Sequence, residues 1–325
     1  MRPILILVSL LAATLAVSVA LGETALSLAQ YRDALFVPGS AAREILIGIR
    51  APRVVCAALV GGALGAAGAV MQGLLRNPLA EPGVLGVSAW SASAAALVIA
   101  SGFGALPGAV ETAALVGALG AGALISILAA RFREPETLIL FGVALAALGG
   151  AATALIFNLS PSPITIAEVQ AWLQGSVDNR DWGDMAPELV PMALGVILCA
   201  YAARGLRMLT LGEESAALSG LPMARLRVAA IAGAALLTGA SVALAGIIGF
   251  VGLAAPHLVR GSVNDDPART LLPSALAGAI LLALADLAAR LIPSEEELRL
   301  GVVTALFGAP LFALVAWRAA RSWRA

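Results

Sequence analysis

GAVMQGLLRNPLAEPGVLG, residues 68–86, is the stretch that decides the fold of this chain. The sequence on either side of it is apolar over about the thickness of a membrane, yet here an arginine, an asparagine, a glutamate and two prolines interrupt the run. Proline cannot continue a helix, and asparagine favours a turn. The stretch therefore predicts two membrane spans joined by a polar turn, whose structural residues are Arg76, Asn77 and Pro78.

The composition of the whole chain is that of an integral membrane protein. Of its 325 residues 60% are hydrophobic and only 12% are charged, whereas about 25% are charged in soluble domains. We expect an all-α polytopic membrane protein with about ten transmembrane helices in a single domain, residues 1–325. The expected full spans are residues 4–21, 54–74, 84–101, 109–130, 138–158, 187–203, 228–248, 271–291 and 300–317.

One further apolar segment, residues 250–259, is too short to cross a membrane, since a full span needs about 17–25 residues. We expect it to be a half-depth helix buried among the others. A weak echo between residues 61–70 and 233–242 suggests two related halves, although shared glycine and alanine content could produce it as well. Residues 1–20 fit a cleavable signal or a first span, and retention as a span is the simpler interpretation.

The arginines indicate the orientation in the membrane. If the ten segments alternate, thirteen of the twenty basic residues, all of them arginine, lie on the side of the amino terminus. This bias predicts that both termini are cytoplasmic and that the chain lies in the inner membrane. Residues 204–227 then form a cytoplasmic segment with a short helical pattern, and residues 159–186 form an outer loop with Trp172 and Trp182, which suit the membrane interface.

Several kinds of active site are excluded. The chain has no lysine, which a Walker A loop requires to reach the nucleotide phosphates. His257 is the single histidine and lacks neighbouring metal ligands, so we interpret it as a packing or hydrogen-bonding residue. Cys56 and Cys199 lie on different spans and are not expected to pair. We therefore expect no catalytic residues, no cofactor, no metal site and no nucleotide hydrolysis by this chain, and its zero net charge gives no field for nucleic acid.

Asp286 is the only acid well inside an apolar segment. An ionisable group within the membrane is a functional candidate, because its burial in lipid is costly. Arg290 follows four residues later, so an ion pair within one helix, with the arginine reaching to the surface, is the alternative. The sequence leaves both interpretations open.

Four segments together resemble one known family. MQGLLRNPLAEPGVLGVS (71–88), the WLQGS…W arrangement (172–182), GIIGFVGLAAPHLVR (246–260) and LGVVTALFGAPLF (300–312) are similar, in this order, to the FecCD-type permeases of ATP-binding cassette importers for iron–siderophore complexes, haem and cobalamin. The chain differs from the usual family pattern at residues 89–90, AW instead of Gly-Ala, and at residues 295–301, EEELRLG. These differences concern the fine geometry of the pathway.

The resemblance implies a homodimer with the pathway at its axis, two separate ATPase subunits and a periplasmic binding protein that delivers the substrate. It implies that residues 204–227 contact the ATPase, where the alternative is an ordinary solvated loop. It also implies that Arg50, Arg53 and Arg290 receive acidic residues of the binding protein, where the alternative is that they anchor span ends. The implied coupling residues are Leu211, Gly212, Glu213, Glu214, Ala217, Leu218 and Gly220.

The expected function is import of an iron(III)–siderophore complex, a choice based on how often the family carries such substrates. Haem and cobalamin are alternatives within the same importer type. An ion-coupled secondary transporter is the alternative from another class, although such a protein would usually show more polar groups near the middle of the membrane.

Overall fold

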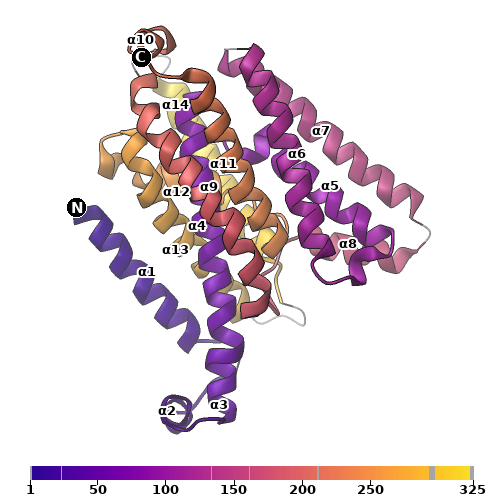
Figure 1. Cartoon of the computed structure of the whole chain (residues 1–325). Coiled ribbons are helices and arrows are strands. Elements are labelled where there is room, and N and C mark those ends of the chain that lie inside the picture. The colour runs from indigo at the N-terminus through magenta and orange to yellow at the C-terminus, as the bar shows by residue number, and fades with distance from the viewer. Residues whose placement is uncertain are drawn as a thin grey trace.

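A computed structural model describes residues 2–22, 24–132, 134–160, 162–210, 212–292 and 297–322. Within these ranges the chain is helical and contains no strand, which confirms the all-α fold class (Figure 1). The helices are α1 (Arg2–Ala20), α2 (Leu28–Phe36), α3 (Ala41–Arg43), α4 (Ala51–Leu75), α5 (Val87–Ala100), α6 (Ala109–Arg131), α7 (Pro135–Leu159), α8 (Pro163–Leu173), α9 (Trp182–Leu209), α10 (Glu213–Leu218), α11 (Met223–Ala245), α12 (Val251–Val259), α13 (Pro267–Leu291) and α14 (Leu300–Ser322).

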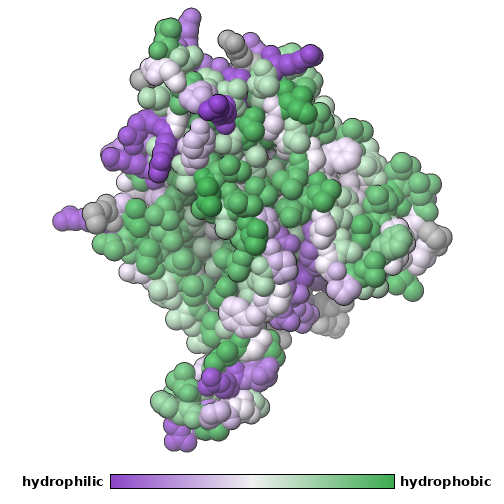
Figure 2. Space-filling view, in the orientation of Figure 1, coloured by the Kyte–Doolittle hydropathy of each residue, from purple (hydrophilic) through white to green (hydrophobic). Residues whose placement is uncertain are grey.

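Seven helical stretches in the described residues are long and apolar enough to span a membrane. They are α1, the continuous stretch from Ala41 to Leu75, α6, α7, α9, α11 and α13. The apolar helices α5, α12 and α14 complete the ten expected segments, with α12 as the short one. Hydrophobic residues cover most of the face seen in Figure 2, and hydrophilic residues gather toward its two ends.

The helices give the bundle two ends, which we call the α10 end and the α2 end. The α10 end carries α10 and the carboxyl-terminal part of α14 (Figure 1). The α2 end carries α2, α3 and the π-helical turn η1 (Glu44–Arg50), which leads into α4 and projects beyond the other helices (Figure 1). Helix α1 runs toward the α2 end from a start about midway along the bundle, whereas the carboxyl terminus lies at the α10 end (Figure 1).

The stretch 76–86 is a turn that folds back into the bundle. Helix α4 ends at Arg76, which is left-handed with φ 48°, and the Asn77 side chain accepts a hydrogen bond of 2.9 Å from the Leu79 N–H. A short 3-10 helix, η2 (Pro82–Leu85), follows, and Gly86, with φ 79°, begins α5. The η2 backbone packs against α7, where a Cβ on Gly142 would lie 2.6 Å from the Val84 carbonyl oxygen. Helix α5 is consequently shorter than the span expected at residues 84–101.

Helix α4 is the centre of the bundle, because it packs against α13, α11, α12 and α9. Its glycines permit backbone-to-backbone contact: a Cβ on Gly61 would collide with the carbonyl of Gly278 in α13, and one on Gly68 would collide with the backbone of Gly252 in α12. Small residues allow such close packing in lipid, where the hydrophobic effect does not drive helices together.

A non-helical segment, residues 246–250, connects α11 to α12. Within a membrane such backbone is tolerated only where protein or water satisfies its polar groups. Beside this segment lies a strap, residues 174–176, whose Ser176 N–H donates to the carbonyl of Ala245, the last residue of α11, at 2.9 Å. The same strap accepts hydrogen bonds from the start of α14, at 2.9 Å from Leu300 to Gly175 and 3.1 Å from Gly301 to Gln174. The end of α11 is therefore joined to the start of α14 by backbone hydrogen bonds through the strap.

We predict that Gly68→Val destabilises the fold, since its side chain must displace the Gly252 backbone. Overpacking a core costs typically about 1–3 kcal/mol, so the melting temperature in detergent should fall clearly. The control is Gly120→Ala in α6, where a Cβ meets nothing within 4 Å. That change should leave the melting temperature unchanged or raise it slightly. Equal melting temperatures for the parent and Gly68→Val would contradict the close approach of α4 and α12.

Candidate functional site

The three arginines proposed for docking from the sequence lie together at the α2 end. Arg50, Arg53 and Arg290 line one pocket of about 380 Å³, which is formed by η1, the start of α4, the end of α13 and the loops beside them. Two acids, Asp178 and Glu297, line the same pocket. Arg50 and Arg290 are only 6% and 7% exposed, so this positive charge belongs to a recess and not to an open surface.

Arg53 is the centre of an ion cluster that joins four parts of the chain. Its Nε donates to Asp286 Oδ1 at 2.9 Å, and its Nη1 contacts Asp178 Oδ1 at 3.1 Å and Glu297 Oε2 at 3.0 Å. Its Nη2 also pairs with Glu297 Oε1. The cluster thereby links α4, α13, the loop after α8 and the residues that lead into α14.

Asp286 pairs with two arginines. Besides Arg53, it contacts Arg290 Nε through Oδ2 at 3.0 Å. The ion pair within α13 that the sequence suggested is therefore present. Both residues are buried, with Asp286 only 1% exposed. Arg290 does not extend to the surface as that interpretation required. A buried acid with two cationic partners is compensated at its site, which makes Asp286 a structural member of the cluster.

Arg50 and Arg290 also hold the carboxyl-terminal end of α1, whose last carbonyls have no partner within the helix. Arg50 Nη1 donates to the Ala20 carbonyl at 2.7 Å, and Arg290 donates to the carbonyls of Ser18 at 3.1 Å and Leu21 at 3.2 Å. Cations are favourable at this end of a helix dipole. These contacts join the carboxyl-terminal end of α1 to α4 and α13.

Asp178 and Glu297, which pair with Arg53, were not among the site residues predicted from the sequence. Glu297 belongs to EEELRLG, one of the two places where the chain differs from the family pattern; residues 293–296 lie outside the described residues. The other difference also has a structural task, because Trp90 donates its indole N–H to the Leu145 carbonyl at 3.0 Å and so joins α5 to α7. An acid in a loop gives no signal of which arginine it will meet.

At the α10 end, another arginine, Arg227, holds the short helix α10 in place. Arg227 Nη2 donates to both carboxylate oxygens of Glu213, at 2.8 and 2.7 Å, and Nη1 donates to the Ala129 carbonyl of α6 at 3.0 Å. Gly212 and Gly220 bracket α10 with φ angles of 99° and 82°, which L side chains rarely adopt. Helix α10 thus packs against α9 and is joined to α11 through the pairing of Glu213 with Arg227.

The remaining predicted coupling residues of α10 face outward. Glu214 and Ala217 are exposed, and Leu218 is 87% exposed. A pocket of about 520 Å³ lies beside them, lined by residues of α6, α10 and α11. Leu211 lies outside the described residues. The structure therefore divides the predicted set: Glu213 holds α10 in place, whereas Leu218 and its neighbours present a free surface.

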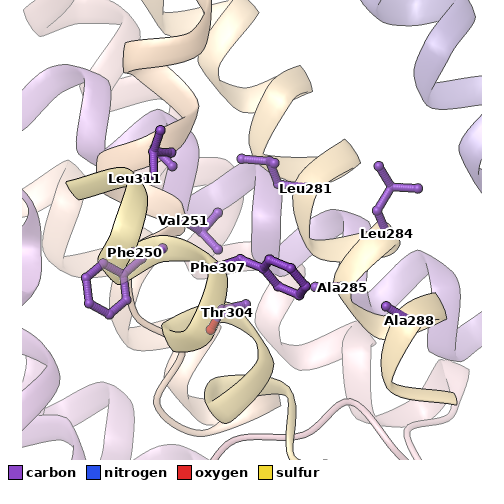
Figure 3. A pocket seen from close by; sticks show the side chains of 11 residues that line it. Phe250, Val251, Leu281, Leu284, Ala285, Ala288, Thr304, Phe307 and Leu311 are labelled. Carbon is purple, nitrogen blue, oxygen red and sulfur yellow. The ribbon is translucent and has the colours of Figure 1, made fainter. Parts of the chain in front are cut away.

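An apolar pocket of about 370 Å³ lies between α12, α13 and α14. Figure 3 shows Phe250, Phe307, Leu281 and Leu284 around it. Phe250 has φ 67°, a strained conformation for an aromatic residue, and it packs against Gly308 of α14. A second pocket of about 670 Å³ adjoins the strap and α14, with Gln174, Ile247 and Gly301 among its lining residues. These hollows offer apolar walls with few polar groups.

The described residues contain no group of three or more side chains suited to a metal ion. His257 lies partly buried on α12, and Cys56 and Cys199 are buried as free thiols.

Comparisons with known proteins agree on one family. Residues 10–318 match the model of the FecCD transport family. The chain is 43% identical over 274 residues to the vitamin B12 import system permease protein BtuC of Vibrio cholerae, a match that covers 83% of this chain and 82% of that protein. It is 41% identical over 290 residues to the uncharacterized ABC transporter permease protein YvrB of Bacillus subtilis, covering 86% and 81%.

A solved structure is similar over almost the full length. It is described as an ABC transporter assigned to the metal-chelate type, in an inward-facing conformation. The TM-score is 0.86 with 30% identity, and the match covers 98% of this chain and 99% of that one.

We predict that Asp286→Asn strongly destabilises the protein, because it leaves the buried Arg290 without its acid and removes one of the acids of the partly buried Arg53. Removing one partner of a buried pair costs about 3–5 kcal/mol. The matched control is Asp33→Asn, which removes an exposed pair with Arg32 at 3.6 Å and should cost at most about 1 kcal/mol. Thermal unfolding in detergent measures both. Similar unfolding temperatures for the two variants would show that the cluster is not important for stability.

Proposed function

This chain belongs to the FecCD transport family of ABC importer permeases, and on that premise we propose that it carries a large metal chelate, with cobalamin as the first candidate. As a transport subunit it is not an enzyme, and in this family ATP hydrolysis belongs to a separate subunit. The observation that carries the substrate proposal is the 43% identity to a permease named for vitamin B12 import, over more than four-fifths of both chains.

An iron(III)–siderophore complex, which the sequence analysis favoured, is the second candidate, and haem is the third. Support for a large chelate of any of these kinds comes from the apolar hollows beside α14. The apolar walls of these pockets can contact a bulky substrate over a large area, without strong polar bonds that would hold it in place. Cobalamin takes first place because its support comes from relatives similar to this particular chain and not from family frequency.

The ATPase subunit is proposed to bind the α10 end. Helix α10 is short, held firmly by the pairing of Glu213 with Arg227, and carries an almost fully exposed leucine. A rigid element with an exposed apolar side chain transmits movement from a partner to the helices behind it. The arginine bias then makes the α10 end cytoplasmic, and with it both termini, in the inner membrane.

The binding protein is proposed to dock at the α2 end, over the pocket formed by Arg50, Arg53 and Arg290. Acidic side chains entering this pocket would compete with Asp178, which is 40% exposed in its side chain, and with Glu297 for Arg53. Glu297 lies three residues before α14. Docking would therefore loosen the attachment of α14, which adjoins both apolar hollows, and so prepare the pathway for substrate.

A homodimer is proposed to complete the pathway. The face of α7 that is exposed in the single chain carries a stripe of small residues at helical spacing: Ala144, Ala147, Ala151 and Ala154. Such stripes let two membrane helices approach closely. Native mass spectrometry of the purified chain should detect two copies, and a single copy under all detergent conditions would contradict the dimer.

The test of the proposed function is uptake by vesicles that contain the chain, its ATPase and its binding protein. We expect ATP-dependent uptake of cobalamin, with little uptake of iron(III)–siderophore complexes or haem. Vesicles without ATP are the control. Uptake of an iron chelate without cobalamin would overturn the substrate proposal, whereas transport that follows an ion gradient without the ATPase would overturn the importer itself.

For the ATPase contact, we predict that Leu218→Asp reduces ATPase binding by roughly tenfold or more, since burying a leucine contributes about 1.5–3 kcal/mol. The matched control is Leu28→Asp at the opposite end, because Leu28 is 89% exposed and Leu218 is 87% exposed. Co-purification with the tagged ATPase measures both variants. Equal ATPase recovery would assign residues 204–227 to an ordinary solvated loop.

For the docking pocket, we predict that Ile49→Glu slows association of the binding protein by roughly tenfold at low salt, with a reduced salt dependence. Ile49 lines the pocket and is 59% exposed, so the change adds a repelling carboxylate without removing an arginine. Ile47→Glu is the control, because Ile47 is 45% exposed and does not line the pocket. Surface plasmon resonance on nanodiscs across a salt series gives both rates; equal rates would leave these arginines as span anchors.

A further inference from the structure

A cleft between α1, α9 and α13 at the α10 end has no part in the proposed transport function. Its volume is about 630 Å³. One wall comes from the first turn of α1, one from the last turns of α9, and the floor from the segment that joins α12 to α13. The cleft is lined by Ile4, Ala200, Arg204, Arg269 and Leu272, among other residues.

The polar part of this cleft is positively charged. Arg204, at the end of α9, is exposed and forms no ion pair or hydrogen bond within the described part of the chain. Arg269, 68% exposed in its side chain, is 3.4 Å from Asp266. Asp266 in turn is held by Arg207, with contacts of 2.6 and 3.2 Å, so its negative charge is already shared between two arginines.

Asp266 stays ionised. Burial opposes this, but hydrogen bonds from Arg207 and from the Ala268 N–H, with the nearby arginine charges, lower the pKa of Asp266 below its usual value. The other acid of the segment, Asp265, is 72% exposed and faces Arg260 at 3.8 Å. Arg204 consequently has no acidic partner among the described residues. Arg269, beside it, shares the charge of Asp266 with Arg207.

The rest of the cleft is apolar and faces the lipid. Ile4, Ala200 and Leu272 line it, and Leu272 is 53% exposed. Helix α1 buries only Thr14 and Ser18 within the chain, so most of its surface is free for lipid. Figure 2 shows hydrophilic residues gathered over the connection between α12 and α13, above a hydrophobic flank. Charge at the membrane boundary above an apolar groove matches the two parts of a phospholipid.

We propose that this cleft binds one anionic phospholipid, with the phosphate held by Arg204 and Arg269 and an acyl chain lying along Ala200 and Leu272. Basic pockets between transmembrane helices on the cytoplasmic side suit anionic head groups. The lipid holds the start of α1 against α9 and α13. At the other end of α1, Arg50 and Arg290 already hold its last carbonyls, so the lipid provides the second attachment of this helix.

The experiment is native mass spectrometry of the full chain in detergent, titrated with phosphatidylglycerol or with phosphatidylcholine. The wild-type chain should retain phosphatidylglycerol at least roughly tenfold more tightly than phosphatidylcholine. Arg204→Gln with Arg269→Gln should weaken phosphatidylglycerol binding roughly 30-fold, at about fivefold for each arginine. The matched control is Arg131→Gln, which removes an exposed arginine at the same end of the bundle, outside the cleft.

A second variant keeps the acyl chain in the test. Ala200→Phe fills the apolar part of the cleft from an exposed position and should weaken phosphatidylglycerol binding with both arginines intact. Equal retention of the two lipids, or equal losses in Arg131→Gln and the double variant, would overturn the proposal. Inorganic phosphate that displaces the lipid at millimolar concentration, and binds Ala200→Phe as well as the wild type, would instead assign the cleft to a free anion.

Discussion

The close approach of α4 to its neighbours at glycine positions is the constraint on which the rest of the structure depends. Lipid tails are as apolar as a leucine side chain, so helices in a bilayer gain little by hiding apolar surface and associate through tight packing. At Gly61 and Gly68 the α4 backbone meets the backbones of α13 and α12 with no side chain between them. Because α4 also contacts α9 and α11, this one helix sets the distances among the central spans.

With α4 fixed, the start of the same helix brings polar groups into register at the α2 end. Arg53 lies one turn into α4 and meets an acid from α13, an acid from the loop after α8 and an acid before α14. The buried part of this cluster, Asp286 with Arg290, contributes modestly to net stability, since desolvation offsets much of the Coulomb attraction, but the loss of Asp286 is costly. The cluster therefore serves to hold several elements together, and a competing acid from outside can act on all of them through Arg53.

The two ends of the molecule use arginine in the same way for different purposes. Arg227 binds a carboxylate of α10 and a carbonyl of α6, and Arg50 binds carbonyls of α1. A guanidinium group has five donors in a planar fork, so one side chain can join a helix end to a neighbouring element. In a chain without lysine, every basic residue has this capacity. The exposed side chains that remain, such as Leu218, are then the ones available to partners.

The sequence by itself determined the all-α membrane fold, the polar turn at residues 76–86, the half-depth helix and the family. The first three follow from local composition, because about 20 apolar residues must form a helix in lipid and proline with asparagine must end one, whereas the family was identified by resemblance in four motifs. It also selected Arg50, Arg53 and Arg290 as a group, through the family resemblance. Only the tertiary structure decided what these arginines contact: Glu297 is 244 residues from Arg53 in sequence, and Arg290 is 269 residues from the Leu21 carbonyl. Helix periodicity shows which face a residue occupies, but not which neighbour lies opposite, since that depends on how closely the glycines let the helices approach.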